Sequence, residues 1–218
     1  MAGGTRRSDE RVSATREVLL TEAERLFAER GVHAVTHRQI SEAAGQGNIA
    51  AVNYHFGTKD DLVRAIARRH GEQIECRRVG MVAGLGDSTD LRAWVACLVR
   101  PVTEHLEILG SPTWYARFAA QIMADPVLFS IVVEESLAMA PLLGSYEDGL
   151  ARCLPHLPTG VITERAVMAR HLTVQMCAER ERALADGTPT FRPTWGAASD
   201  ALIDAIVSLW RTPLKPGA

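Results

Sequence analysis

The sequence predicts an all-α protein in which a small N-terminal helix-turn-helix unit precedes a larger helical region. Three observations support this fold class. Aromatic residues make up only 6% of the 218 residues, so side chains that favour strands are scarce. Apolar residues recur three or four positions apart, without the alternation of a half-buried strand. Glycines and capping residues divide the N-terminal part of the chain into short helices.

The chain begins with a polar, glycine-bearing stretch, and residues 1–11 are expected to form a disordered arm. An amphipathic pattern follows, and Gly31 is its stop signal. This pattern predicts a helix over residues 13–30, with an apolar stripe formed by Leu19, Ala23, Leu26 and Phe27.

Two short helices joined by a glycine-containing turn are expected next. Thr36 can cap the first with its side-chain oxygen, and Gly45 ends it. Asn48 can cap the second, whose inward positions would be Ile49, Val52 and Phe56. This arrangement is typical of a helix-turn-helix unit, which we place at residues 12–58.

The segment TKDDL fits a capping box, with Thr58 as the N-cap and Asp61 at the third helical position. It predicts a linking helix over residues 58–80, which leads into a second helical domain at residues 81–213. The helices expected there cover residues 88–109 with a bend or break at Pro101, 113–124, 126–154 with interruptions at Pro141 and Gly144, 161–185, and 194–211.

The net charge of −2 is unevenly distributed along the chain. Residues 1–70 carry 11 Lys and Arg against 9 Asp and Glu, a balance of +2, which leaves −4 for the rest. This difference points weakly to an N-terminal unit that faces an anion, and a solvated charged face is the alternative. No apolar run of membrane-spanning length and no secretory signal occur, so we expect a cytoplasmic protein without a membrane partner.

The second short helix would present small and hydrogen-bonding side chains on its outer faces. Ala50 and Ala51 have little bulk, so this helix could lie deep in the major groove of DNA. Asn53 has the donor and acceptor geometry that matches adenine. We therefore expect Ala50, Ala51 and Asn53 to read bases, with an ordinary exposed helix face as the alternative.

Other polar side chains in and near the two short helices are suited to phosphate oxygens. Thr36 and Lys59 stand at predicted helix N-termini, where free N–H groups and the helix dipole favour an anion. Arg38 could also be an ordinary surface residue, and His55 a cap or core residue. The full set of expected phosphate contacts is Thr36, Arg38, Asn48, Tyr54, His55 and Lys59.

Residues 15–66 resemble the DNA-binding domain of the TetR family of bacterial transcriptional regulators. Against the commonest family form, the turn GQGN is one residue longer, and Asn53 stands where a tyrosine is more usual. The marks that carry the resemblance are Phe27, Gly31, Thr36, Ile40, Ala44-Gly45, Tyr54-His55-Phe56, Lys59 and Leu62.

The resemblance implies a ligand-responsive repressor that binds a palindromic double-stranded DNA operator. It implies that the second domain binds an unknown small-molecule ligand, and that the protein forms a homodimer through its last two long helices. Candidate pocket residues are aromatic, methionine and histidine side chains, which could equally be plain core. They are Trp94, Trp114, Tyr115, Phe118, Met123, Phe129, His171 and Met176.

Two other classes of function stay open on the sequence. A helix-turn-helix regulator could sense oxidation through Cys97, Cys153 or Cys177, or an all-helical enzyme or binding module could share the N-terminal pattern by chance. The enzyme class is poorly supported, because no GxSxG, P-loop or dinucleotide-binding glycine pattern occurs. The histidines lack metal-ligand spacing on a helix. We therefore expect no catalytic residue, metal or cofactor.

Overall fold

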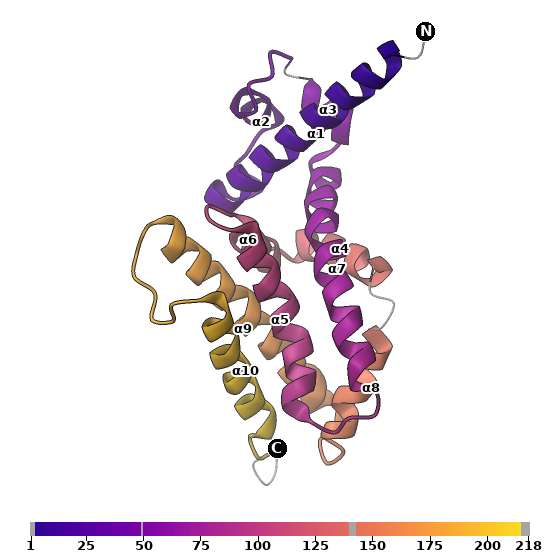
Figure 1. Ribbon diagram of the computed structural model, residues 1–218, viewed down its shortest axis with the longest axis vertical. Helices are drawn as coiled ribbons and strands as arrows, with labels where there is room; N and C mark the ends of the chain where they lie inside the picture. Colours follow the sequence, from indigo (N-terminus) through magenta and orange to yellow (C-terminus); the bar gives the residue numbers. More distant parts are fainter. Residues whose placement is uncertain (1–2, 49, 140–142, 215–218) are drawn as a thin grey trace.

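A computed structural model describes residues 3–48, 50–139 and 143–214, and these residues form ten α-helices without a strand (Figure 1). The predicted all-α fold class is confirmed. The first four helices are α1 (Gly3–Arg30), α2 (His37–Ala43), α3 (Ala51–Phe56) and α4 (Lys59–Leu85). The other six are α5 (Leu91–Leu109), α6 (Tyr115–Ala124), α7 (Pro126–Met139), α8 (Leu143–Cys153), α9 (Thr159–Ala185) and α10 (Trp195–Arg211).

Helix α1 begins earlier than the sequence predicts. It extends back to Gly3, so most of the expected disordered arm is helical and the expected start at residue 13 is wrong. The reason is that residues 5–16 contain neither proline nor glycine, and extending an existing helix adds one hydrogen bond for each residue that is ordered. The polar composition of this stretch therefore did not prevent helix formation.

The caps of α2 and α4 are those that the sequence predicts. Thr36 accepts a hydrogen bond from the Gln39 N–H, and the Gln39 side chain accepts one from the Thr36 N–H. Thr58 and Asp61 form the same reciprocal pair at α4, and the Thr58 hydroxyl donates to Asp61 Oδ2 at 2.6 Å. That hydrogen bond lowers the pKa of the Asp61 carboxyl.

Helix α3 starts later than expected, and Asn48 is not its N-cap. The N-cap is Ala50, which has no side-chain oxygen to offer. Asn48 Oδ1 instead accepts the Ala50 N–H at 2.9 Å, ahead of the helix. The extra residue of the longer turn is therefore accommodated before α3 begins. Ile49, which was expected to face inward, lies outside the described residues.

Helix α5 continues through Pro101, where a bend or break was expected. Proline lacks an N–H group, so the carbonyl of Cys97, four residues earlier, loses its helical partner. Arg78 of α4 supplies a replacement, because its Nε donates to the Cys97 carbonyl at 3.0 Å. A neighbouring helix therefore satisfies the carbonyl that the proline leaves free.

The region expected at 126–154 forms two helices. Asp125 Oδ1 accepts the N–H groups of Val127 and Leu128 and so caps the start of α7 before Pro126. Gly144 does not interrupt a helix but lies inside α8. The interruption expected at Pro141 falls outside the described residues.

The helices surround two main apolar cores. The first contains residues of α1 to α4 together with Phe118 and Ile122 of α6 and Leu128 and Ile131 of α7. Phe27 stacks on Phe118 with ring centroids 6.4 Å apart. The N-terminal helices therefore share their core with the second helical region, across the boundary that the sequence predicts.

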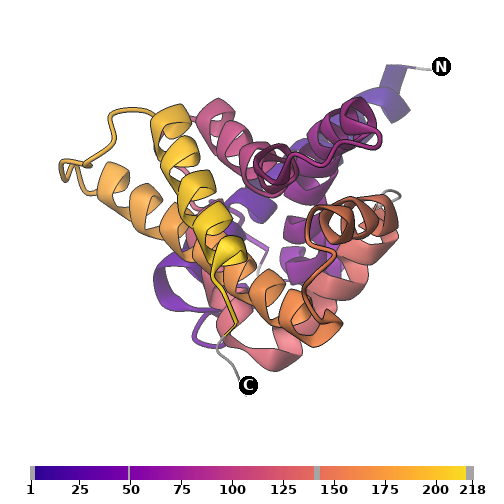
Figure 2. The same cartoon turned by 90° about the horizontal axis from the view of Figure 1, so that it is seen from below.

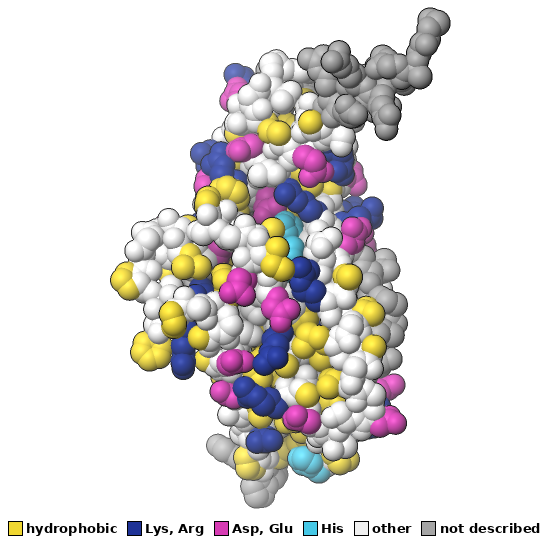
Figure 3. Space-filling view, viewed as in Figure 1, with side chains coloured by type: hydrophobic (Ala, Val, Ile, Leu, Met, Phe, Trp, Pro, Cys, Tyr) yellow, Lys and Arg dark blue, Asp and Glu magenta, His cyan; other side chains and the backbone are white. Residues whose placement is uncertain are grey.

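The second core lies between α5, α8, α9 and α10. Helix α10 runs along α5, and the segment that joins α9 to α10 projects from the side of the molecule (Figure 2). Basic and acidic side chains alternate where α5 meets α10, as Figure 3 shows, and Arg100 pairs there with Asp200 at 3.3 Å. No single helix of the described ranges is long and apolar enough to cross a membrane, although the bent pair α6 and α7 passes that test by length and composition.

Candidate nucleic-acid interface

The end of the molecule that carries α2 and α3 lies opposite the C-terminus (Figure 1). Helix α3 is held there by Val52, which is fully buried, and by Phe56. Arg16 of α1 packs its guanidinium over the Phe56 ring, 4.7 Å from the centroid. These contacts leave one face of α3 outside the core.

Ala51 is not on that outer face, so its predicted base-reading position is wrong. It is 7% exposed and belongs to the first apolar core. Ala51 is the first residue of α3 and lies in the same cluster as Val52 and Phe56, so the buried face of this helix is wider than predicted. Ala50, the residue before it, is exposed.

Two other predicted contact residues face outward beside Ala50. Asn53 is exposed, and Tyr54 is 79% exposed, far more than an aromatic side chain usually is. The Tyr54 ring meets the half-buried His55 ring edge to face, with centroids 5.0 Å apart. This outer face of α3 therefore combines a small residue, an amide and a phenol.

The side chains of α2 are partly engaged within the protein. The Thr36 hydroxyl is taken up in its capping box, although the residue is exposed. Arg38 pairs with Glu42 at 2.7 Å, and the hydrogen bond to Glu42, followed by its charge, raises the pKa of the guanidinium. Both residues would have to change or share these partners to meet a phosphate.

Lys59 is tied to the segment between α1 and α2. Its Nζ donates to the carbonyl of Val32 at 3.1 Å, and the residue is partly buried. This contact explains a cation in the first turn of a helix without any bound anion. An ammonium has three donors, so two of them stay available to a phosphate.

His37 was missed by sequence reasoning. It is the first residue of α2, and its Nδ1 forms a hydrogen bond with Oδ1 of Asn53 in α3. The two residues are 16 positions apart, and no helical spacing or motif links them. Only the packing of α2 against α3 brings them together.

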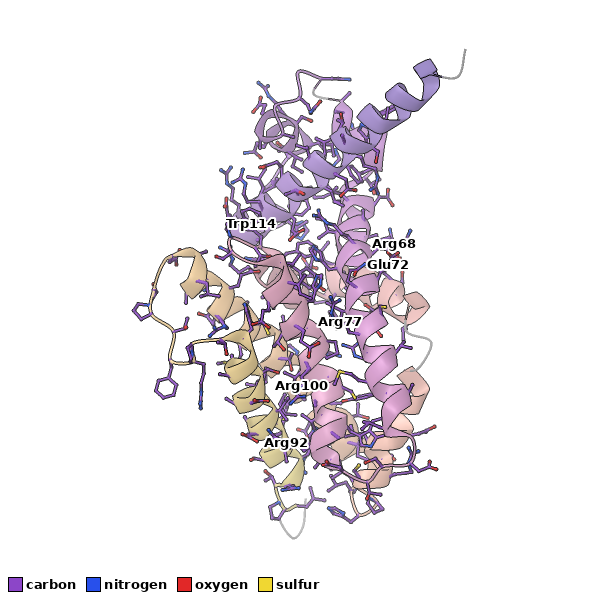
Figure 4. The ribbon with its side chains drawn as sticks, in the orientation of Figure 1. Arg68, Glu72, Arg77, Arg92, Arg100 and Trp114 are labelled. Atoms are coloured by element: carbon purple, nitrogen blue, oxygen red, sulfur yellow. The ribbon has the colours of Figure 1, made fainter. Side chains whose placement is uncertain are left out.

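A groove of about 480 Å³ between α1 and α4 was also missed. Its basic side chains come from both helices, and Arg68 and Glu72 follow each other along α4 in Figure 4. Arg64 and Arg68 already pair with Asp61 and Glu135. The polar residues that line the groove are Arg16, Glu17, His55, Asp61, Arg64, Arg68, Arg69 and Glu72.

The predicted ligand-pocket residues are distributed over several parts of the molecule. Trp94 is buried in the second core and donates its indole N–H to the Ser88 carbonyl at 2.8 Å, whereas Phe118 is buried in the first core. His171 is exposed on α9, and Met176 is 53% exposed. These four do not line one cavity, because two are core residues and two face outward.

The other four candidates lie on α6 and α7 or beside them. Trp114 is the N-cap residue of α6, and Tyr115 follows it with its ring stacked on His70 of α4, 4.0 Å between centroids. Arg170 lies over the Phe129 ring at 4.8 Å. Met123 is half-buried.

Three buried ionisable side chains join α1, α4 and α5, and sequence reasoning did not find them. His70 Nε2 lies 2.8 Å from Glu24 Oε2, and His70 Nδ1 lies 2.8 Å from His105 Nε2. Burial, followed by the positive charges of His70, Arg77 and Arg69, lowers the pKa of His105 to about 4. The sequence contains one signal of this cluster, because the charged residue Glu24 falls within the apolar stripe of α1.

The three thiols named as candidate oxidation sensors, Cys97, Cys153 and Cys177, do not favour that role. Burial raises the pKa of Cys97 and Cys153, and it raises that of Cys177 to about 12. A raised pKa leaves less of the reactive thiolate at neutral pH. Among the described residues, no group of three His, Cys, Asp or Glu side chains is arranged to hold a metal ion.

An apolar groove of about 520 Å³ lies along the C-terminal half of α9 and the N-terminal half of α10. Its rim carries Phe191, which is 93% exposed, and its wall carries Arg180, whose guanidinium lies 5.0 Å from the centre of the Trp195 ring. Of the predicted pocket residues, only Met176 lines this groove.

The comparisons with known proteins concern first the N-terminal helices. Residues 19–66 match the family model described as bacterial regulatory proteins, tetR family. Over 60 residues the chain is 37% identical to the HTH-type transcriptional repressor AcnR of Corynebacterium glutamicum. That match covers 28% of this chain and 31% of AcnR, so it spans about a third of the relative's length.

One solved structure extends the similarity to the rest of the fold. The TetR family transcriptional regulator PfmR from Thermus thermophilus is similar with a TM-score of 0.52 and 18% identity, over 90% of this chain and 99% of PfmR. A putative TetR-family regulator from Mesorhizobium loti has a TM-score of 0.46 and 14% identity, over 91% of this chain and 98% of that one. At such identity the similarity to PfmR concerns the fold alone.

Proposed function

Residues 19–66 of this chain match the family model of the TetR bacterial regulatory proteins, and on that premise we propose that the protein is a transcriptional repressor that binds operator DNA. The observation that carries the proposal is the outer face of α3. An amide and a phenol stand free of the core there, beside the small side chain of Ala50. A helix with such a face fits the major groove, which is about 12 Å wide.

In this proposal α3 reads bases and the side chains around it hold the DNA backbone. Ala50 permits close approach to a base edge, and Asn53 supplies the hydrogen bonds. The backbone contacts come from Thr36, Arg38, Asn48, Tyr54, His55 and Lys59, as the sequence predicts. Because the target is chromosomal DNA, we place the protein in the cytoplasm.

The test is fluorescence anisotropy of the purified protein on DNA from upstream of its own gene, with scrambled competitor and a salt series. Tight binding that resists the competitor and weakens steeply with salt would support a sequence-specific regulator. If neither this DNA nor neighbouring intergenic DNA binds better than the scramble, the repressor proposal fails.

Replacing Lys59 with Met should weaken binding to the operator and to unrelated DNA by the same factor. One phosphate contact is lost, so the slope of log K against log salt should become shallower by roughly one unit. Lys59→Arg keeps the charge and should keep the slope. An unchanged slope in Lys59→Met would show that Lys59 makes no phosphate contact and bonds only to the Val32 carbonyl.

We further propose that a second copy of the chain covers the groove on α9 and α10. The predicted dimer uses these two helices, and the groove gives them an apolar surface whose lining includes the exposed residues Phe191 and Met176. Exposed apolar surface of this kind is typical of protein interfaces. Two-fold symmetry would place two α3 helices about 34 Å apart, or a multiple of it, on a palindromic operator.

Met176→Glu should convert the dimer to a monomer, because a charge would be buried without a partner in the interface. Light scattering after size-exclusion chromatography measures the mass directly. Ile108→Glu is the matched control, since Ile108 is 68% exposed near the end of α5 and does not line the groove. A dimeric Met176→Glu, or a monomeric wild type, would contradict this interface.

The proposed regulator responds to a small molecule that binds its second helical domain. The family supplies this expectation, and the cluster of Glu24, His70 and His105 supports it by connecting α1 to α4 and α5. A ligand that moves α4 or α5 would shift α1 through these hydrogen bonds. Thermal-shift screening of a metabolite library, followed by release of bound DNA, tests this part of the proposal.

A further inference from the structure

The hydrogen bond between His37 and Asn53 connects the two helices of the helix-turn-helix unit. His37 is partly buried and Asn53 is exposed, so the histidine approaches the amide from the protein side. The backbones of both residues are held in place. The Thr36 capping box fixes the first turn of α2, and burial of Val52 and Phe56 fixes α3.

The chemistry of the two side chains decides which atom carries the proton. An amide oxygen only accepts hydrogen bonds, so Nδ1 of His37 must be the donor. His37 Nε2 lies in a buried position with no hydrogen-bond partner among the described residues. Nδ1 of the ring is therefore engaged in the hydrogen bond to Asn53, and Nε2 on the other side is enclosed by protein.

This bond fixes the direction of the Asn53 amide. Its oxygen faces α2, and its NH₂ group, which carries two donors, is the end that this bond leaves for DNA. The oxygen has a second lone pair, but a bidentate pair with adenine needs the oxygen and the NH₂ group side by side at the base edge, and this oxygen is turned toward α2. Guanine presents two acceptors, N7 and O6, in the major groove, so it pairs with the NH₂ group and needs no acceptor from Asn53.

We propose that His37 is a positioning residue that orients the Asn53 amide so that α3 reads guanine at one base pair of each half-site. This inference rests on the proposed function as a DNA-binding regulator. The Asn53 amide alone predicts a match to adenine. In this inference, the hydrogen bond from His37 on α2 changes the preferred base to guanine. His37 itself makes no contact with DNA in this proposal.

The experiment is selection of binding sites from a randomised DNA library by the full-length protein, with sequencing of the bound fraction. Wild type should enrich guanine at one position per half-site, and Asn53→Ala should lose that preference, by roughly 5- to 100-fold. His37→Ala and His37→Met remove the donor, so guanine enrichment should fall at the same position and adenine should rise. His37→Gln restores an N–H donor and should restore guanine.

Two controls separate positioning from a general effect. His33→Ala removes an exposed histidine that pairs with Asp125 outside the interface, and it should leave the base ranking unchanged. The salt slope of His37→Met should equal that of wild type, because no phosphate contact is lost. A double variant that combines His37→Met with Asn53→Ala should discriminate between bases no worse than Asn53→Ala alone.

Three results overturn the inference. The first is that the His37 variants keep the wild-type ranking of bases. The second is that wild type enriches adenine at the position whose preference is lost in Asn53→Ala. The third is that the salt slope of His37→Met falls by one unit. If wild type enriches no sequence at all, the repressor proposal itself fails. That result differs from the other three, in which specific binding is present.

Discussion

Acidification from pH 6.5 to pH 4 should lower the free energy of unfolding by about 3 kcal/mol through His105 alone. The folded protein holds the pKa of this imidazole at about 4, below its ordinary value of 6.5. Between these values the unfolded chain binds the proton and the folded chain does not. The stability is therefore fully present above pH 6.5 and is lost as the pH falls toward 4.

Urea unfolding at a series of pH values measures this effect when wild type is compared with His105→Gln. Glutamine does not titrate, so the stability difference between the two proteins should shrink as the pH falls through the window. His171→Gln removes an exposed histidine and should follow wild type. Parallel curves for wild type and His105→Gln would contradict the prediction.

The geometry of the buried cluster explains where the acid-sensitive contact lies. His70 donates from Nε2 to Glu24, and one proton is shared between His70 Nδ1 and His105 Nε2. Protonation makes His105 a buried cation close to the positive charges of Arg77 and Arg69. The connection from α1 and α4 to α5 should therefore loosen first.

Gly149→Ala should destabilise the second helical domain by about 1–3 kcal/mol, because the added methyl group has no space. A Cβ atom at this position would lie 2.3 Å from Cη2 and Cζ2 of the Trp94 ring. Trp94 is 1% exposed and is fixed by its hydrogen bond to Ser88, so the ring cannot move aside freely. Thermal unfolding should show a lower midpoint.

Gly144→Ala is the matched control, since it makes the same substitution in the same helix. A Cβ atom there meets nothing within 4 Å. Gly144 lies in the first turn of α8, where alanine brings no clash, so this variant should be at least as stable as wild type. Equal effects of the two substitutions would show that Trp94 does not pack against Gly149 in this way.

Local patterns predicted the parts of the fold that depend on neighbouring residues. Thr36 and Thr58 cap α2 and α4 as expected, because a capping box needs only four consecutive residues. Asn48 was misplaced as the N-cap because α3 starts later than the spacing predicts, and Ala51 was misplaced because the buried face of α3 is wider than Val52 and Phe56 alone indicate. The base-reading role of Asn53 and the phosphate roles stay predictions.

The sequence by itself determined the helical fold class and the helix-turn-helix unit, since helical spacing and end signals are short-range properties. Only the tertiary structure decided which polar groups meet. The pairing of His37 with Asn53, the joining of Glu24 to His70 and His105, and the support of the Cys97 carbonyl by Arg78 depend on how helices pack. A hydrogen bond between residues on different helices is set by the positions of both helices, and no periodicity along the chain records it.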